Sequence, residues 1–182
     1  QCALFIKSIS TKDSKGLWEI QGEWSPEHGP TDVTAFAQQT SYELLDEIFK
    51  AHAELGDESP LTSEQISAIQ DLYDNFDKGL WVETWNGKDN ISEWKNNALS
   101  DQTHRHLSHL MCLYPFSQVS AFDKSEEGQK LFKAAHNGQI ARNGDVTGWS
   151  MGWQTNTYAR CLDGENARRN LTLALRHSGS YV

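Results

Sequence analysis

The stretch from Val33 to Leu55 constrains the fold more than any other part of the chain. Its apolar residues recur at helical spacing and fall on one stripe of a helix. They are Phe36, Ala37, Leu44, Leu45, Ile48, Phe49 and Leu55. Thr31 or Asp32 can cap the start of this helix, and Gly56 stands where a helix commonly ends. A stripe of this length must be buried against other elements, so the chain is predicted to be mainly α.

Further helices are predicted along the rest of the chain. Thr62 and Gln65 match a capping box before a second helical stripe that runs from Ile66 to Phe76. Four shorter helices are predicted at 104–113, 126–135, 149–162 and 165–177. Residues 80–97 are aromatic and polar without a helical period, which predicts a long loop with one short strand. Paired helices joined by long loops favour part of an α/α toroid over a four-helix bundle with short loops.

The N-terminal part has a different character. Residues 1–32 lack a helical period and are predicted to form extended segments, turns and one loop that carries an acid. The 182 residues are therefore divided into 1–32, extended, and 33–182, helical, within one domain. Because the chain starts at Gln1 and ends at Val182 after a polar Ser-Gly-Ser, we expect it to be an internal fragment of a larger domain.

Charge and motif content exclude several classes of function. There are 25 Asp and Glu residues against 16 Lys and Arg, a formal charge of −9, which argues against nucleic acid and against a polybasic membrane contact. The longest apolar run, Cys2–Ile6, falls far short of the ~20 residues of a membrane span. Three cysteines without a Cys-x-x-Cys pair favour neither a disulfide framework nor a zinc site. Phosphate-binding glycine motifs are absent, so no nucleotide cofactor is expected.

Seven tryptophans stand mostly beside Gly, Asn, Ser, Glu or Gln. A sugar ring has one apolar face and a rim of hydroxyl groups, so flat rings next to hydrogen-bonding groups are typical of a carbohydrate site. Packing in the core is the alternative explanation for such rings.

The acid in residues 25–30 is the first candidate for chemistry. Pro26, Gly29 and Pro30 restrict the backbone around Glu27. A carboxyl group held near apolar neighbours such as Trp24 has a raised pKa and can serve as a general acid. The alternative is a turn with a solvated glutamate.

Histidines dominate the second candidate, residues 103–110. His104 and His106 are two positions apart and cannot share a helical face, which argues against zinc. On a helix, Arg105 would share a face with His109, and His106 with Leu110, giving a polar wall suited to sugar hydroxyls. Capping or core histidines are the alternative.

Two further segments complete the set. In residues 145–154, Trp149 could stack on a ring while Gly148 and Gly152 permit close approach; a helix cap is the alternative. In residues 91–94, Glu93 precedes Trp94 in an aromatic loop, and a salt-bridged structural glutamate is the alternative.

Taken in order, the four segments resemble glycoside hydrolase family 95. They are Trp-Ser-Pro-Glu-His-Gly-Pro at 24–30, Ile-Ser-Glu-Trp at 91–94, His-Arg-His-Leu-Ser-His-Leu at 104–110 and Thr-Gly-Trp-Ser at 147–150. That family is best known for inverting α-L-fucosidases, and some members act on α-L-galactosides. The resemblance runs from about Trp18 to His177. It implies a six-fold α/α toroid catalytic domain of which this chain is the middle.

The resemblance also implies roles for individual residues. It makes Glu27 the general acid, Arg105 and His106 sugar contacts, and Glu93 and Trp149 pocket residues, with no metal and no cofactor. The family's water-positioning asparagines and their assisting aspartate belong to motifs that do not occur in these 182 residues. The implied partners are a fucosylated oligosaccharide or glycan and the remainder of the catalytic domain, and the implied location is periplasmic or secreted.

Two alternatives to an exo-acting α-L-fucosidase stay open. An α-L-galactosidase would differ by accepting one hydroxyl on the methyl carbon of the sugar, which a single pocket side chain could decide. A non-catalytic helical carbohydrate-binding module would have no need for an acid held as tightly as Glu27.

Overall fold

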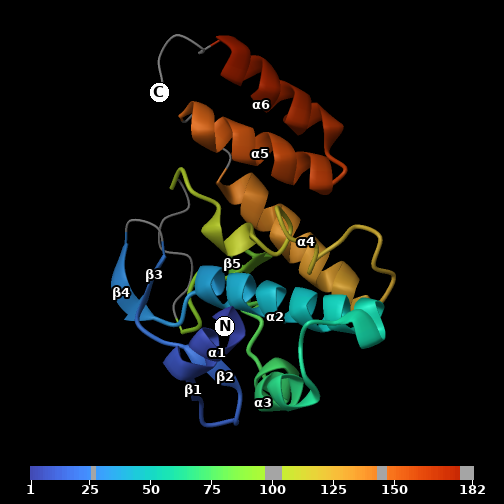
Figure 1. Ribbon diagram of the computed structural model, residues 1–182. Coiled ribbons are helices and arrows are strands. Elements are labelled where there is room, and N and C mark those ends of the chain that lie inside the picture. Colours follow the sequence, from blue (N-terminus) through green and yellow to red (C-terminus); the bar gives the residue numbers. More distant parts are fainter. Residues whose placement is uncertain (26–27, 97–103, 143–146, 177–182) are drawn as a thin grey trace.

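The computed structural model describes residues 1–25, 28–96, 104–142 and 147–176 (Figure 1). Within these ranges the chain forms six α-helices and three two-stranded antiparallel sheets. The helices are α1 (Cys2–Ile9), α2 (Ala35–Leu55), α3 (Ser63–Asp74), α4 (Glu126–Ala141), α5 (Gly148–Arg160) and α6 (Gly164–Arg176). The strands are β1 (Ser10–Lys12), β2 (Trp18–Ile20), β3 (Glu23–Ser25), β4 (His28–Asp32), β5 (Val82–Trp85) and β6 (Lys88–Ile91). The prediction of a mainly α chain is confirmed.

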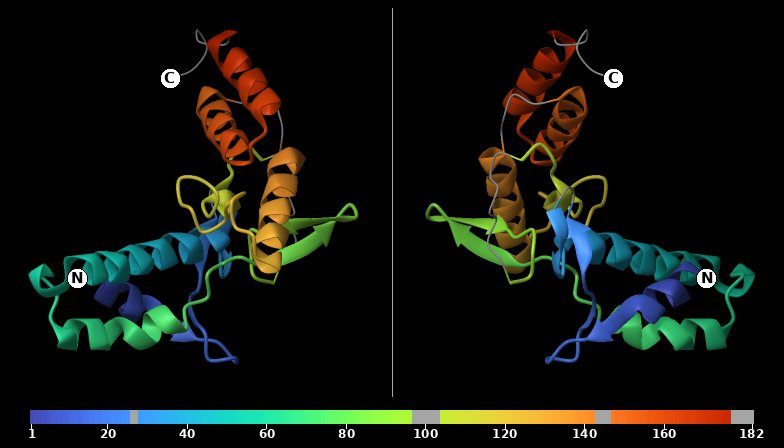
Figure 2. Two further views of the ribbon diagram at one scale, coloured as in Figure 1. Left: turned by 90° about the vertical axis from the view of Figure 1, so that its right-hand side faces the viewer. Right: turned by 90° about the vertical axis from the view of Figure 1, so that its left-hand side faces the viewer.

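Helices α1, α2 and α3 form one end of the molecule together with the β1–β2 hairpin (Figure 2). Ala3 and Ile6 of α1 are buried against a core that includes Leu45 and Leu72. The prediction that residues 2–9 are extended is wrong. Ala3 and Ile6 are three positions apart and share a helical face, and their burial stabilises a helix too short to form alone.

The ends of α2 and α3 follow from capping chemistry. Thr34, rather than Thr31 or Asp32, caps α2, and its hydroxyl accepts a hydrogen bond from the Ala37 amide at 3.2 Å. Gly56, at φ +53°, ends the helix as predicted. Thr62 and Gln65 form the reciprocal capping box expected at the start of α3.

Residues 82–91 form a hairpin, whereas the sequence predicts a loop with a single strand. Asn86 and Gly87 both have positive φ, at 49° and 73°, as a two-residue hairpin turn requires. The Asn-Gly pair is the signal that would have identified this hairpin. β6 packs against α4, and Ile91 lies in a second core with Leu110, Leu113 and Ala135.

The predicted helix at 104–113 is also wrong. Only Ser108–Leu110 makes a short 3-10 turn, between irregular backbone and turns. Gln39 of α2 accepts a hydrogen bond from the Cys112 amide at 2.8 Å and donates one to the His109 carbonyl at 2.9 Å. These side-chain bonds take the place of helical ones.

Helix α4 extends to Ala141, six residues beyond its predicted end at 135. α5 and α6 lie within one residue of their predicted starts and within two of their predicted ends. They pack side by side as a helical pair at the opposite end of the molecule from α3 (Figures 1 and 2). This mainly helical arrangement is consistent with part of an α/α toroid. None of the helices described is both long and apolar enough to cross a bilayer.

Candidate functional site

Segments that are far apart in the sequence meet where α2 begins. The Ala35 amide donates to the Glu93 carbonyl at 2.9 Å, and the Lys95 amide donates to the Val33 carbonyl at 3.0 Å. The chain that follows β4 is thereby fixed beside residues 93–95.

Side chains connect the remaining segments. The Ser108 hydroxyl donates to Glu93 Oε1 at 2.7 Å, and the Ser150 hydroxyl donates to the Arg105 carbonyl. The three candidate segments at 91–94, 104–110 and 147–150 therefore form one contiguous region.

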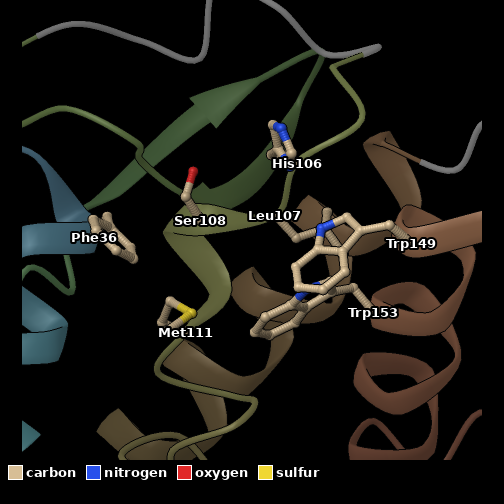
Figure 3. A pocket seen from close by; sticks show the side chains of 7 residues that line it. All are labelled: Phe36, His106, Leu107, Ser108, Met111, Trp149 and Trp153. Carbon is tan, nitrogen blue, oxygen red and sulfur yellow. The ribbon is translucent and has the colours of Figure 1, made fainter. Parts of the chain in front are cut away.

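A pocket opens in this region. It is lined by Phe36, His106, Leu107, Ser108, Met111, Trp149 and Trp153. Figure 3 shows Phe36 on one side, the two tryptophans on the other, and Ser108 and Met111 between them. Its volume of about 240 Å³ is below the ~300–1,000 Å³ typical of sites for drug-sized ligands, so it suits one small ring.

The two tryptophans owe their position to helical spacing. Trp149 and Trp153 are four residues apart at the start of α5 and project from the same face. Their rings meet edge to face, with centroids 6.0 Å apart, and Trp149 remains 65% exposed. Trp149 therefore presents a large apolar surface in the same pocket as the polar side chains of His106 and Ser108.

Glu93 lies behind the pocket wall. It is 3% exposed and forms an ion pair with Arg142, with Nη2 2.5 Å from Oε2. Arg142, at the C-terminal end of α4, is 1% exposed and also donates from Nη1 to the His106 carbonyl at 2.6 Å. The structure thus shows Glu93 in the salt-bridged state that the sequence offered as its alternative.

Arg142 is a residue that the sequence analysis missed. Its local sequence, Ile140-Ala141-Arg142, resembles any helix that ends in a solvated basic residue, because a cation is favourable at that end of a helix. Only the tertiary structure shows that its charge is buried.

Arg105 and His106 occupy different environments. His106 is half-buried and lines the pocket, while Arg105 is exposed and is not among the seven residues that line it. The His106 amide donates to His104 Nδ1 at 3.1 Å, and the two imidazole rings lie 5.3 Å apart. In the described part of the chain, no three His, Cys, Asp or Glu side chains are grouped so as to hold a metal ion.

His109 does not share a face with Arg105. It is fully buried, and a Cβ added at Gly138 of α4 would lie 3.3 Å from its Nε2. Burial lowers the pKa of His109 to about 3, and the charge of Arg142 adds to this effect while Glu93 opposes it. His109 is therefore a neutral core residue, the alternative that the sequence left open.

Glu27 lies outside the described residues. The strands on either side of Glu27 in the sequence, β3 and β4, pair with each other through Glu23 with Asp32 and Ser25 with His28.

Comparison with known proteins identifies the family of this chain. The sequence matches the glycosyl hydrolase family 95 catalytic domain over residues 1–182. It is similar to the probable alpha-fucosidase A of Aspergillus oryzae (strain ATCC 42149 / RIB 40), at 29% identity over 160 residues, or 83% of this chain and 21% of that protein. The probable alpha-fucosidase A of Aspergillus niger is 30% identical over 162 residues, covering 84% of this chain and 19% of that protein.

Alpha-L-fucosidase 2 of Arabidopsis thaliana is 26% identical over 183 residues, covering 94% of this chain and 20% of that protein. The chain spans about a fifth of the length of the curated relatives it matches. The family match nevertheless extends over every residue, and the chain belongs to glycosyl hydrolase family 95, as part of its catalytic domain.

Proposed function

We propose that the protein containing this chain is an inverting, exo-acting α-L-fucosidase that removes terminal α-linked L-fucose from oligosaccharides or glycans. The observation that carries this proposal is the pocket in which Trp149 and Trp153 face Phe36, beside His106 and Ser108. The names of the curated relatives support fucose as the sugar.

The part of the pocket that this chain forms has room for one ring, which is compatible with an exo-acting enzyme that binds a terminal sugar. L-Fucose carries a methyl group on its ring, and apolar side chains such as Met111 and Leu107 offer that methyl group a contact that water does not.

Glu27 is proposed as the general acid, with Trp149 stacking on the sugar and Arg105 and His106 binding its hydroxyl groups. An inverting glycosidase uses a second group, ~6.5–9.5 Å from the acid, to activate water. We propose that the residues for that role belong to the rest of the catalytic domain, which this chain needs as its partner. The proposed location is secreted or periplasmic, where glycan substrates are accessible.

The test uses the full-length protein. Hydrolysis of nitrophenyl α-L-fucoside is compared with that of nitrophenyl α-L-galactoside, and proton NMR follows the anomer that is released first. Release of β-L-fucose, with a marked preference for the fucoside, is the expected result. Preference for the galactoside would replace fucose with galactose, initial release of the α anomer would contradict inversion, and inertness toward both would contradict a glycosidase.

A further inference from the structure

The backbone of residues 105–106 is held by side chains rather than by regular secondary structure. Two successive carbonyl groups are bonded in this way: that of Arg105 accepts from the Ser150 hydroxyl, and that of His106 accepts from Arg142 Nη1 at 2.6 Å. The segment lies outside any helix or strand. The location of the His106 ring in the pocket wall therefore depends on these contacts.

Arg142 reaches the pocket wall at a second point through Glu93. Its other guanidinium nitrogen, Nη2, binds Glu93 Oε2 at 2.5 Å, while Glu93 Oε1 accepts from the Ser108 hydroxyl at 2.7 Å. His106 and Ser108 both line the pocket, so one buried ion pair holds the backbone of one lining residue and the side chain of another. Arg142 and Glu93 themselves do not line it.

The same arginine is also connected to the helix that carries the tryptophans. Gln154 of α5 donates from Nε2 to the Arg142 carbonyl at 3.3 Å, and Gln154 follows Trp153 directly. Arg142 is thus connected directly to the backbone of His106, through Glu93 to Ser108, and through Gln154 to the helix that carries both tryptophans.

Stability alone is a poor explanation for this pair. Removing two charges from water costs several kcal/mol for each ion, and replacing buried ion pairs with apolar residues of similar volume is often neutral or stabilising. A planar guanidinium that binds a carboxylate and a carbonyl at once fixes geometry, which an apolar pair does not.

We propose that Arg142 and Glu93 are positioning residues that set the sugar-binding geometry of His106 and Ser108 without touching the substrate. This inference rests on the proposed function, and it gives Glu93 a role behind the pocket instead of within it.

Arg142→Lys in the full-length protein is the decisive variant. A lysine keeps the charge opposite Glu93, but its single ammonium group cannot reproduce the fork that also binds the His106 carbonyl. We expect a loss of melting temperature no larger than that of the control below, because the buried charge is kept, and a rise in KM for the fucoside of about tenfold or more, because hydrogen bonds to charged groups are among the stronger ones. Glu93→Gln should raise KM as well, since a neutral amide holds Arg142 less tightly.

Thr157→Val is the matched control. Thr157 on α5 donates to Gln139 Oε1 on α4 at 2.5 Å, and both residues are fully buried. The variant removes a buried polar contact between the same two helices at a residue that does not itself line the pocket. It should lower the melting temperature and leave KM unchanged.

Two results would overturn the inference. One is a wild-type KM in the Arg142→Lys protein, and the other is a KM for Thr157→Val that rises as much as that of Arg142→Lys. A crystal structure of the full-length Arg142→Lys variant separates this inference from the proposed function. If the wild-type protein hydrolyses no fucoside, the proposed function fails, whereas unmoved His106 and Ser108 in the variant contradict the positioning role.

Discussion

At the scale of single residues, buried polar side chains determine where the irregular parts of the chain lie. Gln39 is fully buried in α2 and binds three backbone groups, those of Gly79, His109 and Cys112. Its neighbour Gln38 accepts from the Ile20 amide at 2.8 Å and donates to the Asp77 carbonyl at 2.7 Å. A buried polar group without a partner costs about 1–3 kcal/mol, so these contacts fix the loops around α2 strongly.

Glu27→Gln is the residue-scale test of the chemistry. In the full-length protein we expect a loss of ~10²–10⁴-fold in turnover of natural fucosides, because general acid catalysis contributes about that much when the leaving group is basic. An activated nitrophenyl fucoside should lose much less, and binding of L-fucose should persist. Equal losses on both kinds of substrate, measured by steady-state kinetics, would show that Glu27 is not the acid.

His109 makes stability depend on pH. Its pKa is about 3 in the folded protein and near 6.5 in an unfolded chain, so below pH 6.5 the unfolded state binds more protons. We expect the contribution of His109 to the free energy of unfolding to be constant above pH 6.5. It should then fall by up to about 1.4 kcal/mol per pH unit between pH 6.5 and 3.

The free energy of unfolding in urea is measured for the wild-type protein and for His109→Phe at several pH values across this range. Phenylalanine has a flat ring and does not titrate, so the variant should lose less stability on acidification. The side chains of Arg142 and Glu93 act on His109 in the folded state and remain in both proteins. If the free energy of unfolding falls equally steeply with pH in the two proteins, His109 does not have a lowered pKa in the folded state.

At the scale of elements, close approach of α2 and the Asp77–Leu80 turn leaves no room for a side chain at Gly79. This residue has φ +67°, and a Cβ there would lie 2.8 Å from Gln38 Cβ and 3.1 Å from the Ala35 carbonyl oxygen. Only glycine combines that backbone conformation with such an approach.

Gly79→Ala is therefore expected to lower the melting temperature more than Gly16→Ala. Gly16 also has positive φ, +82°, but nothing lies within 4 Å of its Cβ position. Gly16→Ala should lose about 1–2 kcal/mol of stability, because alanine disfavours the left-handed conformation. Any additional loss of stability in Gly79→Ala measures the clash with α2. Equal melting temperatures for the two variants would show that α2 shifts to accommodate the added methyl group.

How far the elements could be predicted from the sequence depended on whether their signals were local. The stripe and Gly56 identified α2, and Thr62 with Gln65 identified α3, because capping and periodicity act within a few residues. α1 was missed because its burial against α2 and α3 is a tertiary effect. Residues 104–113 were predicted to be helical because their contacts with Gln39 and Arg142, distant in sequence, are not visible in the segment itself.

At the scale of the whole molecule, Lys95 connects parts that are far apart in the sequence. Its ammonium group lies 2.9 Å from Asp13, 2.5 Å from Glu19 and 3.0 Å from Asp77. The hydrogen bond from Lys95 lowers the pKa of Asp13 to about 2. Because Lys95 follows Glu93 by two residues, this cluster ties the β1–β2 hairpin to the region behind the pocket.

The candidate site was partly predictable at this scale. The four segments were identified by residue type and order, and the structure brings 91–94, 104–110 and 147–150 together. Trp149 and His106 do line a pocket, whereas Glu93 lies behind it and His109 in the core. Spacing alone could not separate these roles, because burial depends on which element covers each side chain.

The α5–α6 pair leads to the last prediction, which concerns the 182-residue chain expressed alone. Leu171 and Leu175, four residues apart on α6, are 51% and 69% exposed, Trp149 is exposed on α5, and Leu162 is exposed in the turn between the two helices. Large exposed apolar patches are typical of surfaces that contact other protein, and the chain spans about a fifth of its relatives. We expect the isolated chain to self-associate and to hydrolyse no fucoside.

Size-exclusion chromatography with light scattering measures this association. Replacing Leu171 and Leu175 by glutamate in the isolated chain should reduce it, because charge on the patch opposes burial against a second copy. The same double substitution in the full-length protein should lower its melting temperature if the rest of the catalytic domain covers α6. A monodisperse, cooperatively melting isolated chain that cleaves fucoside would contradict both the need for the remaining domain and the location of the water-activating residues outside these 182 residues.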